Sequence, residues 1–73
     1  MRPNPADAAA IDMIVGNLHV ATSDEDVLAL IASRINVDMA SPDGYPEALA
    51  AEALRVHHAN RDMYSRVVTG RIR

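Results

Sequence analysis

The sequence predicts an all-α fold, a small bundle of three helices. Apolar residues recur with the i, i+3, i+4, i+7 spacing of amphipathic helices, and a helix-start signal precedes each of these runs. The chain has 73 residues, and a chain of this length buries only roughly 60% of the surface that its unfolded form exposes. We therefore expect residues 1–73 to form a single helical domain.

The first helix is expected over about residues 5–20. Asn4 is a candidate N-cap, Pro5 suits the first helical position, and Asp7 follows three residues after the cap. Gly16 lies away from the apolar stripe and costs about 1 kcal/mol relative to Ala, which favours a shorter helix. The stripe itself consists of Ile11, Ile14, Val15 and Leu18.

The second helix is expected over about residues 23–36. Ser23 with Asp26, or Thr22 with Glu25, matches the spacing of a capping box. Acidic residues gather in the first turn, where the helix dipole stabilises negative charge. The apolar sector of this helix consists of Val27, Leu28, Leu30, Ile31 and Ile35.

A loop over residues 37–45 separates the second helix from a long third helix over about residues 46–69. Prolines and Gly44 break the helical period in the loop, and its length argues against a helix-turn-helix, whose helices are joined by about 3–4 residues. Pro46 suits the first turn of the third helix, and Gly70 is placed to close it in a left-handed cap.

The third helix carries an apolar sector that is wider than one neighbouring helix needs. Six residues in this sector follow one another at alternating intervals of four and three, which is the spacing of a coiled-coil seam. A polar Asn within such a seam fixes the register of the paired helices. The chain has no cysteine, so disulfides cannot support this small domain and self-association is the expected support. We expect a homodimer whose interface or core contains Leu49, Ala53, Val56, His57, Asn60, Met63, Tyr64 and Val67.

His57, Asn60 and Tyr64 share one side of the third helix, while His58 points elsewhere. Two interpretations stay open. The three side chains satisfy one another's hydrogen bonds in a buried trio, or His57 and Tyr64 lie at the edge of the core and bond to water or backbone. A ligand or catalytic role for the trio is a third, less favoured interpretation.

The charge of the chain is divided along its length. Residues 1–54 hold two arginines and nine acidic residues, a formal charge of −7, whereas residues 55–73 hold five arginines and one aspartate, or +4. A basic end is typical of a contact with nucleic acid or another acidic partner. The overall charge of −3 and the preference for cations late in a helix make this the alternative. Its candidate residues are Arg61, Arg66, Arg71 and Arg73.

Catalytic and metal-binding patterns are missing from the sequence. It contains no nucleophile elbow, phosphate loop or dinucleotide motif. His58 and Asp62 share a helix face but supply two ligands, and zinc takes three or four from a protein. We expect no enzymatic activity, no catalytic residue, no metal and no cofactor.

No apolar run approaches the ~18 residues of a membrane span, and the N-terminus lacks the order of a secretory signal, so we expect a cytoplasmic protein without membrane contact.

The stretch YPEALAAEALRVHHANRDMYSRVVTGR, preceded by SDEDVLALIASRI, resembles short helical proteins encoded by actinobacterial phages and prophages. The resemblance covers about two thirds of the chain, and it implies a phage accessory or host-interaction protein without assigning any catalytic residue. The polar positions that carry it are His57, His58, Asn60, Arg61, Tyr64 and Gly70. A fainter similarity, from DVLALIA to GYPEALAAEAL, is to small antitoxin-like helical regulators, although the chain lacks their Gly-rich N-terminal strand motif.

These observations favour a small non-enzymatic protein-interaction module, which binds a second copy of itself and a host or phage protein. The alternative is a small regulator that contacts nucleic acid through the arginine-rich C-terminal part.

Overall fold

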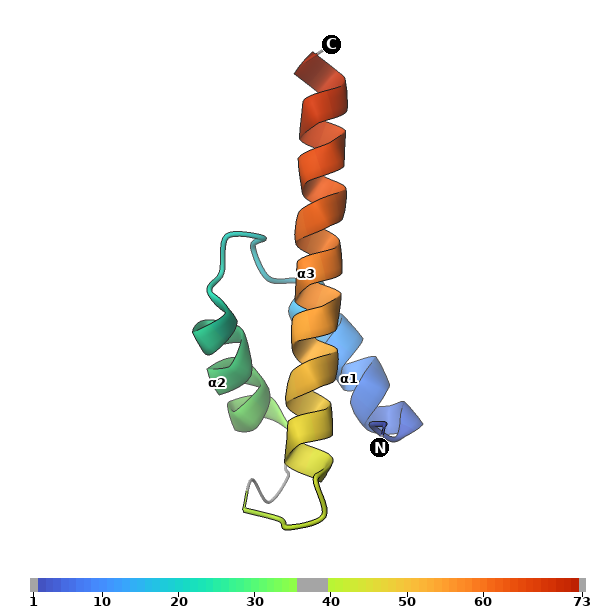
Figure 1. Cartoon of the computed structure of the whole chain (residues 1–73), viewed down its shortest axis with the longest axis vertical. Coiled ribbons are helices and arrows are strands. Elements are labelled where there is room, and N and C mark those ends of the chain that lie inside the picture. Colours follow the sequence, from blue (N-terminus) through green and yellow to red (C-terminus); the bar gives the residue numbers. More distant parts are fainter. Residues whose placement is uncertain (1, 36–39, 73) are drawn as a thin grey trace.

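A computed structural model describes residues 2–35 and 40–72 of the chain, with side chains over residues 2–35 and 40–70. Within these residues the fold is all-α, with three helices in the order α1 (Pro5–Gly16), α2 (Asp24–Arg34) and α3 (Tyr45–Ile72). Figure 1 shows α1 and α2 beside the first half of α3, while the second half of α3 projects beyond them. The predicted fold class of three helices is confirmed.

The start of α1 follows from its capping residues, and its end is earlier than expected. The Asn4 side chain accepts a hydrogen bond of 2.8 Å from the backbone N–H of Asp7, and Pro5 occupies the first turn. The helix ends at Gly16 and does not reach residue 20. Glycine weakens the last turn, and the side-chain amide of Asn17 donates to the carbonyl oxygen of Met13, so the backbone turns away at this point.

The first turn of α2 is capped by Ser23, whose hydroxyl oxygen accepts a hydrogen bond of 3.2 Å from the backbone N–H of Asp26. This confirms the Ser23–Asp26 pairing at the helix start. The helix ends at Arg34, and Ile35 is its C-cap. Residues 36–39, which include the last position expected in the helix and the start of the expected loop, lie outside the described residues.

The loop before α3 ends in a turn that only Gly44 adopts easily. Gly44 has a φ of 83°, in the left-handed region that side chains with a Cβ disfavour. The Asp43 carboxylate accepts hydrogen bonds from the Ser41 hydroxyl and the Tyr45 backbone N–H, which lowers the pKa of this carboxyl. The helix begins at Tyr45 with Pro46 in its first turn, as the sequence indicates.

α3 is one uninterrupted helix of 28 residues, longer at its C-terminal end than expected. It continues through Gly70 to Ile72, so the left-handed cap predicted at Gly70 is wrong. Beyond α1 and α2 no packed element redirects the backbone of α3, so the helix continues past Gly70. At 1.5 Å per residue α3 is about 42 Å long, and the molecule measures 49 × 20 × 16 Å.

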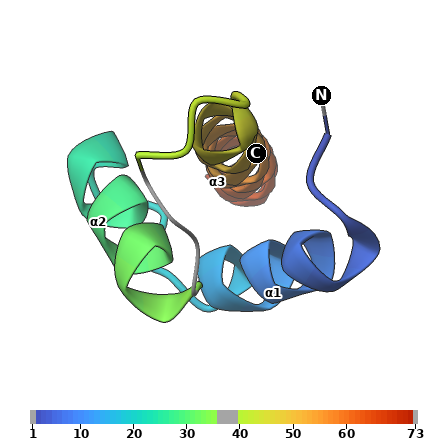
Figure 2. The same ribbon diagram turned by 90° about the horizontal axis from the view of Figure 1, so that it is seen from below.

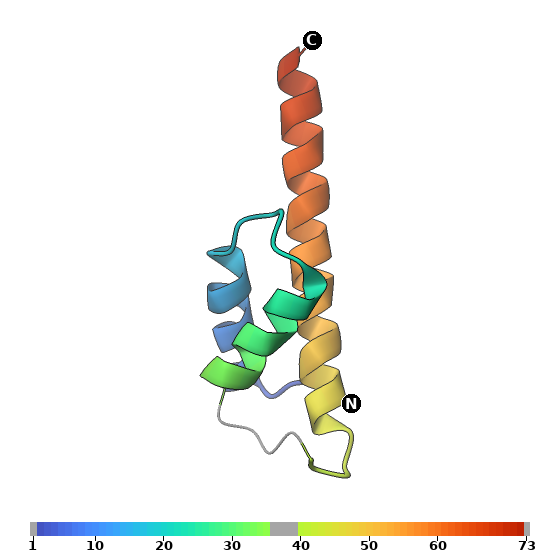
Figure 3. The ribbon, with the colours of Figure 1, turned by 90° about the vertical axis from the view of Figure 1, so that its left-hand side faces the viewer.

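The core lies on one side of α3, between it and the two short helices. Figures 2 and 3 show α1 and α2 on the same side of α3, with the opposite side left open. The radius of gyration is 13.6 Å, whereas a compact chain of this length has about 11 Å, because half of α3 is outside the packed part. The buried apolar residues are Ile11, Val15, Val27, Ile31, Ile35, Leu49 and Ala53.

Within the described residues, none of the three helices has both the length and the apolar character that crossing a membrane requires.

Candidate functional site

The seam predicted along α3 is divided by the structure into a buried half and an exposed half. Leu49, Ala53 and His57 are buried in the chain's own core, each at 1% exposure or less. Val56 and Asn60 are half-buried. The remaining interface candidates, Met63, Tyr64 and Val67, lie beyond α1 and α2 and are exposed to solvent by 65%, 55% and 49%.

Val68 joins these three residues, and we call Met63, Tyr64, Val67 and Val68 the exposed stripe. All four are large apolar or aromatic side chains that the structure leaves open to solvent. The steps of three and four residues put the exposed stripe in line with the buried part of the same helix. It therefore continues the core-facing surface of α3 past the point where α1 and α2 stop covering it (Figure 1).

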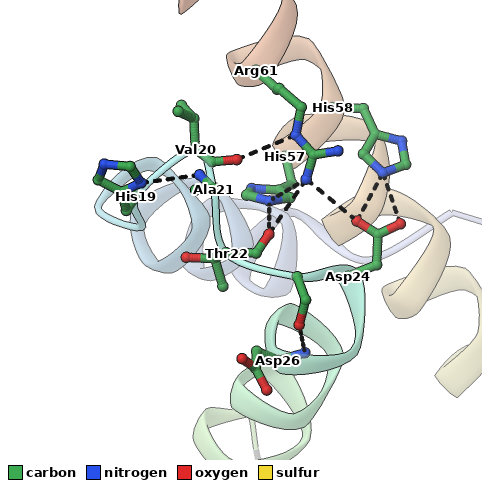
Figure 4. A network of polar contacts seen from close by, with 10 residues as sticks. His19, Val20, Ala21, Thr22, Asp24, Asp26, His57, His58 and Arg61 are labelled. Carbon is green, nitrogen blue, oxygen red and sulfur yellow. Dashed lines mark hydrogen bonds and ion pairs between the residues drawn. The ribbon is translucent and has the colours of Figure 1, made fainter.

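A group of polar contacts fixes α3 to the rest of the chain just before the exposed stripe begins (Figure 4). We call Thr22, Asp24, His57, His58 and Arg61 the polar clamp. Three of these residues lie on adjacent turns of α3, and the other two lie at the start of α2 and just before it. The clamp joins segments that are more than 30 residues apart in the sequence.

His57 is the buried member of the clamp. Its Nε2 atom lies 2.7 Å from the carbonyl oxygen of Thr22, and because a carbonyl oxygen only accepts, Nε2 carries the hydrogen and donates it. The Arg61 Nη2 atom lies 3.2 Å from the same Nε2 atom. A guanidinium also only donates, so this approach is not a hydrogen bond between them. Both groups donate to the Thr22 carbonyl, which Arg61 Nη2 reaches at 3.3 Å.

Arg61 holds the segment between α1 and α2 at a second point. Its Nε atom donates to the carbonyl oxygen of Val20 over 3.2 Å. Figure 4 shows the guanidinium between this segment and Asp24, and its Nη2 atom lies 3.8 Å from Oδ1 of Asp24. Arg61 is also a candidate for contact with an acidic partner, and in this structure its Nε and Nη2 atoms are directed to the chain itself while the side chain stays 46% exposed.

His58 and Asp24 form the outer part of the clamp, where both side chains are about half exposed. His58 Nε2 lies 3.0 Å from each carboxylate oxygen of Asp24. The hydrogen bond from His58 lowers the pKa of the Asp24 carboxyl, and the positive charge of Arg61 acts in the same direction. The two histidines point to different partners, as expected, with ring centroids 6.3 Å apart.

The buried trio of His57, Asn60 and Tyr64 does not form. His57 bonds to the Thr22 backbone, the kind of partner that the alternative gave it, but at 1% exposure it lies within the core and not at its edge. Tyr64 lies in the exposed stripe. The acceptor of His57, the Thr22 carbonyl oxygen, and the partner of His58, the Asp24 carboxylate, were not predicted. The acidic first turn of α2 was visible, but nothing in the sequence indicates that it meets the paired histidines.

A second long-range contact, also missed, joins the start of α1 to the start of α3. The Tyr45 hydroxyl donates to the Asp7 carboxylate over 2.6 Å and accepts a hydrogen bond from the Asn4 backbone N–H. The hydrogen bond to Asp7 raises the pKa of Tyr45. This contact anchors the lower end of the bundle, far from the exposed stripe (Figure 3).

The remaining candidates for an acidic partner are on the projecting half of α3. Arg66 is exposed, whereas the side chain of Arg71 and the whole of Arg73 lie outside the described residues. A surface hollow of about 420 Å³ lies between the N-terminal segment and the outer face of α3, and the Glu52–Arg55 ion pair is in its wall. Among the described residues, no three His, Asp or Glu side chains gather where they could hold a metal ion.

These features define a small all-α protein in which one amphipathic helix extends past its own bundle. No family model, no curated protein and no solved structure matches the chain.

Proposed function

We propose that the protein is a non-enzymatic protein-interaction module that binds a second copy of itself through the exposed stripe. The observation that carries this proposal is the continuity of the stripe with the core. Met63 and Val67 follow Leu49 and Ala53 on the same side of one unbroken helix, so the chain presents a core-type surface that its own helices do not cover.

The cost of leaving this surface in water supports the proposal. Burying a large apolar side chain completely stabilises a structure by about 1.5–3 kcal/mol, and the exposed stripe holds four of them. The bundle itself is small, with seven buried apolar residues among those described. Pairing two stripes adds apolar burial to a domain that has no disulfide to support it.

The polar clamp supports a role for the projecting half of α3 in binding. It fixes α3 at His57 and Arg61, immediately before the exposed stripe, so the projecting turns continue from a fixed base. A helix held in this way loses less conformational entropy on binding than a segment that has to fold first. The surface is thus preorganised for a partner.

The resemblance to phage and prophage accessory proteins is the basis for proposing that a host or phage protein is a further partner. Binding of nucleic acid is the second candidate function, because the basic part of the chain coincides with the projecting end of α3 and Arg66 is exposed there. This candidate fails if random duplex DNA shows no affinity at low salt, where phosphate contacts are strongest.

Sedimentation of paired variants tests the proposed self-association. Val67→Glu places a charge in the exposed stripe, whereas Thr69→Glu places the same charge two residues later on the outward side of α3. We expect wild type and Thr69→Glu to sediment with twice the mass of one chain at micromolar concentration, and Val67→Glu to sediment as a monomer. A monomeric wild type, or equal behaviour of the two variants, contradicts the proposal.

A further inference from the structure

We propose that the two copies pair with their α3 helices antiparallel, so that the C-terminal turns of each copy approach the acidic start of α2 in the other. This inference rests on the proposed self-association and goes further, because it specifies the orientation of the partner. Three features of the structure lead to it: the position of α1 and α2, the distribution of charge, and the size of the exposed stripe.

The first feature is that α1 and α2 lie on one side of α3 (Figures 2 and 3), and the helical spacing puts the exposed stripe on the same side as the buried Leu49 and Ala53. In a parallel pair, the first half of the partner's α3 would lie in the space that α1 and α2 occupy. Its own α1 and α2 would meet the first copy in the same way. In an antiparallel pair, the first half of the partner's α3 lies beyond the C-terminal end of the first copy's α3. The two bundles then lie at opposite ends of the pair.

The second feature is charge complementarity. The first turn of α2 contains Asp24, Glu25 and Asp26, and the polar clamp places this turn next to the base of the exposed stripe. The projecting turns of α3 are basic in sequence, with Arg66, Arg71 and Arg73 against Asp62, although Arg66 itself lies on the side away from the exposed stripe. Antiparallel pairing brings the basic end of one copy toward the acidic turn of the other. Parallel pairing sets two basic ends side by side, within the ~10 Å over which charges interact in 0.1 M salt.

The third feature is area. A stable interface buries roughly 800 Å² on each partner, more than four partly exposed side chains supply. In a parallel pair the contact stops at the stripe, because the bundles must stay apart. In an antiparallel pair each C-terminal end also contacts the segment between α1 and α2 of the other copy, which extends the interface on both sides of the two-fold axis.

Distances between spin labels test the orientation. The chain has no cysteine, so a single introduced cysteine carries a single label. Glu47→Cys places it at an exposed position in the first turn of α3, about 18 residues and so about 27 Å from the middle of the exposed stripe. We expect labels in an antiparallel pair to be about 55 Å apart, whereas in a parallel pair they would lie at the same level along α3, with the two bundles between them, about 40 Å apart.

Thr69→Cys is the matched control, because Thr69 lies at the same level along α3 as the exposed stripe but on the outward side of the helix. Labels there are less than about 30 Å apart in either orientation, so a short distance reports that a pair has formed. A short distance at position 69 with a distance of about 40 Å at position 47 overturns the antiparallel proposal but leaves the self-association intact. If neither position gives a distance between chains, the proposed self-association and the antiparallel orientation both fail.

Discussion

His57 Nε2 and the carbonyl oxygen of Thr22 are 2.7 Å apart, a hydrogen bond that ties the middle of α3 to the segment between α1 and α2. His57 is 1% exposed, so it acts as a core residue with one polar atom directed at the backbone. The same carbonyl receives Arg61. The packed part of the molecule ends at the level of these two hydrogen bonds, and the exposed stripe begins directly beyond it.

His57→Ala is expected to lower the free energy of unfolding by about 3 kcal/mol, because it leaves a cavity in the core and removes one of the two donors to the partly buried Thr22 carbonyl. His58→Ala is the matched control on the next residue, where the side chain is half exposed and its loss should change stability far less. Urea unfolding followed by circular dichroism measures both variants. Equal effects of the two substitutions would contradict the assignment of His57 to the core.

Asp24 is expected to make folding stability depend on acid pH. Its pKa is lowered from 3.8 chiefly by the hydrogen bond from His58, so folding favours the carboxylate. The contribution is complete above the unfolded value and is lost as the pH falls through the lower folded value. Asp24→Asn should therefore be less stable than wild type at about pH 5, and the difference should shrink as the pH falls below 3.8 and on through the lower folded pKa.

Unfolding curves across this pH range check the prediction for Asp24. Asp62→Asn serves as the control, because the described residues give Asp62 no hydrogen bond or ion pair. A stability difference for Asp24→Asn that grows with acidification would show that the clamp does not stabilise the charged carboxylate.

Tyr45 is expected to ionise above pH 10.0, its ordinary value, because its hydroxyl donates to the Asp7 carboxylate. The raised pKa means that this contact stabilises the fold below pH 10 and that the contribution is lost as the pH rises through the folded pKa. In Tyr64→Phe, Tyr45 is the sole tyrosine, so the absorbance of its phenolate follows this group alone. Adding Asp7→Asn should move the midpoint back toward 10, and a midpoint unaffected by Asp7 would refute the contact.

The two glycines at either end of α3 should respond oppositely to alanine. Gly44 has a positive φ, so Gly44→Ala should cost about 1 kcal/mol of stability. Gly70 lies within the helix with open space around the position of a Cβ, so Gly70→Ala should raise helix content, which circular dichroism measures. A loss of stability in Gly70→Ala would instead favour the left-handed cap that the sequence pattern suggested.

The local features of the fold were predictable because short-range signals determine them. The caps at Asn4 and Ser23 and the turn at Gly44 each depend on residues within four positions, and apolar spacing assigns the core faces of all three helices. Helix ends were less predictable. Gly16 ends α1 with the help of the Asn17 side chain, whereas Gly70 does not end α3, and residue type alone does not separate the two cases.

The partners of the polar side chains in the polar clamp were not predictable from the sequence. For His57 the sequence left open a trio on its own helix or a bond to water or backbone, and it did not indicate that the acceptor is the backbone of Thr22, 35 residues earlier. Arg61 was predicted as a possible contact for an acidic partner, and its hydrogen bonds to the carbonyls of Val20 and Thr22 were not foreseen. Both contacts depend on how α1 and α2 fold back onto α3, which is a property of the packed structure.

Hydrogen exchange at the backbone amides of residues 61–70 tests the central claim most directly, because it reports whether the projecting half of α3 is covered in solution. Within one copy the projecting turns of α3 pack against neither α1 nor α2, so local opening should let these amides exchange faster than those of the core in dilute protein, and exchange should slow at least about tenfold as concentration rises and copies pair. Fast exchange at every concentration, or protection that is the same in dilute and concentrated protein, would contradict the claim that a second copy covers the exposed stripe.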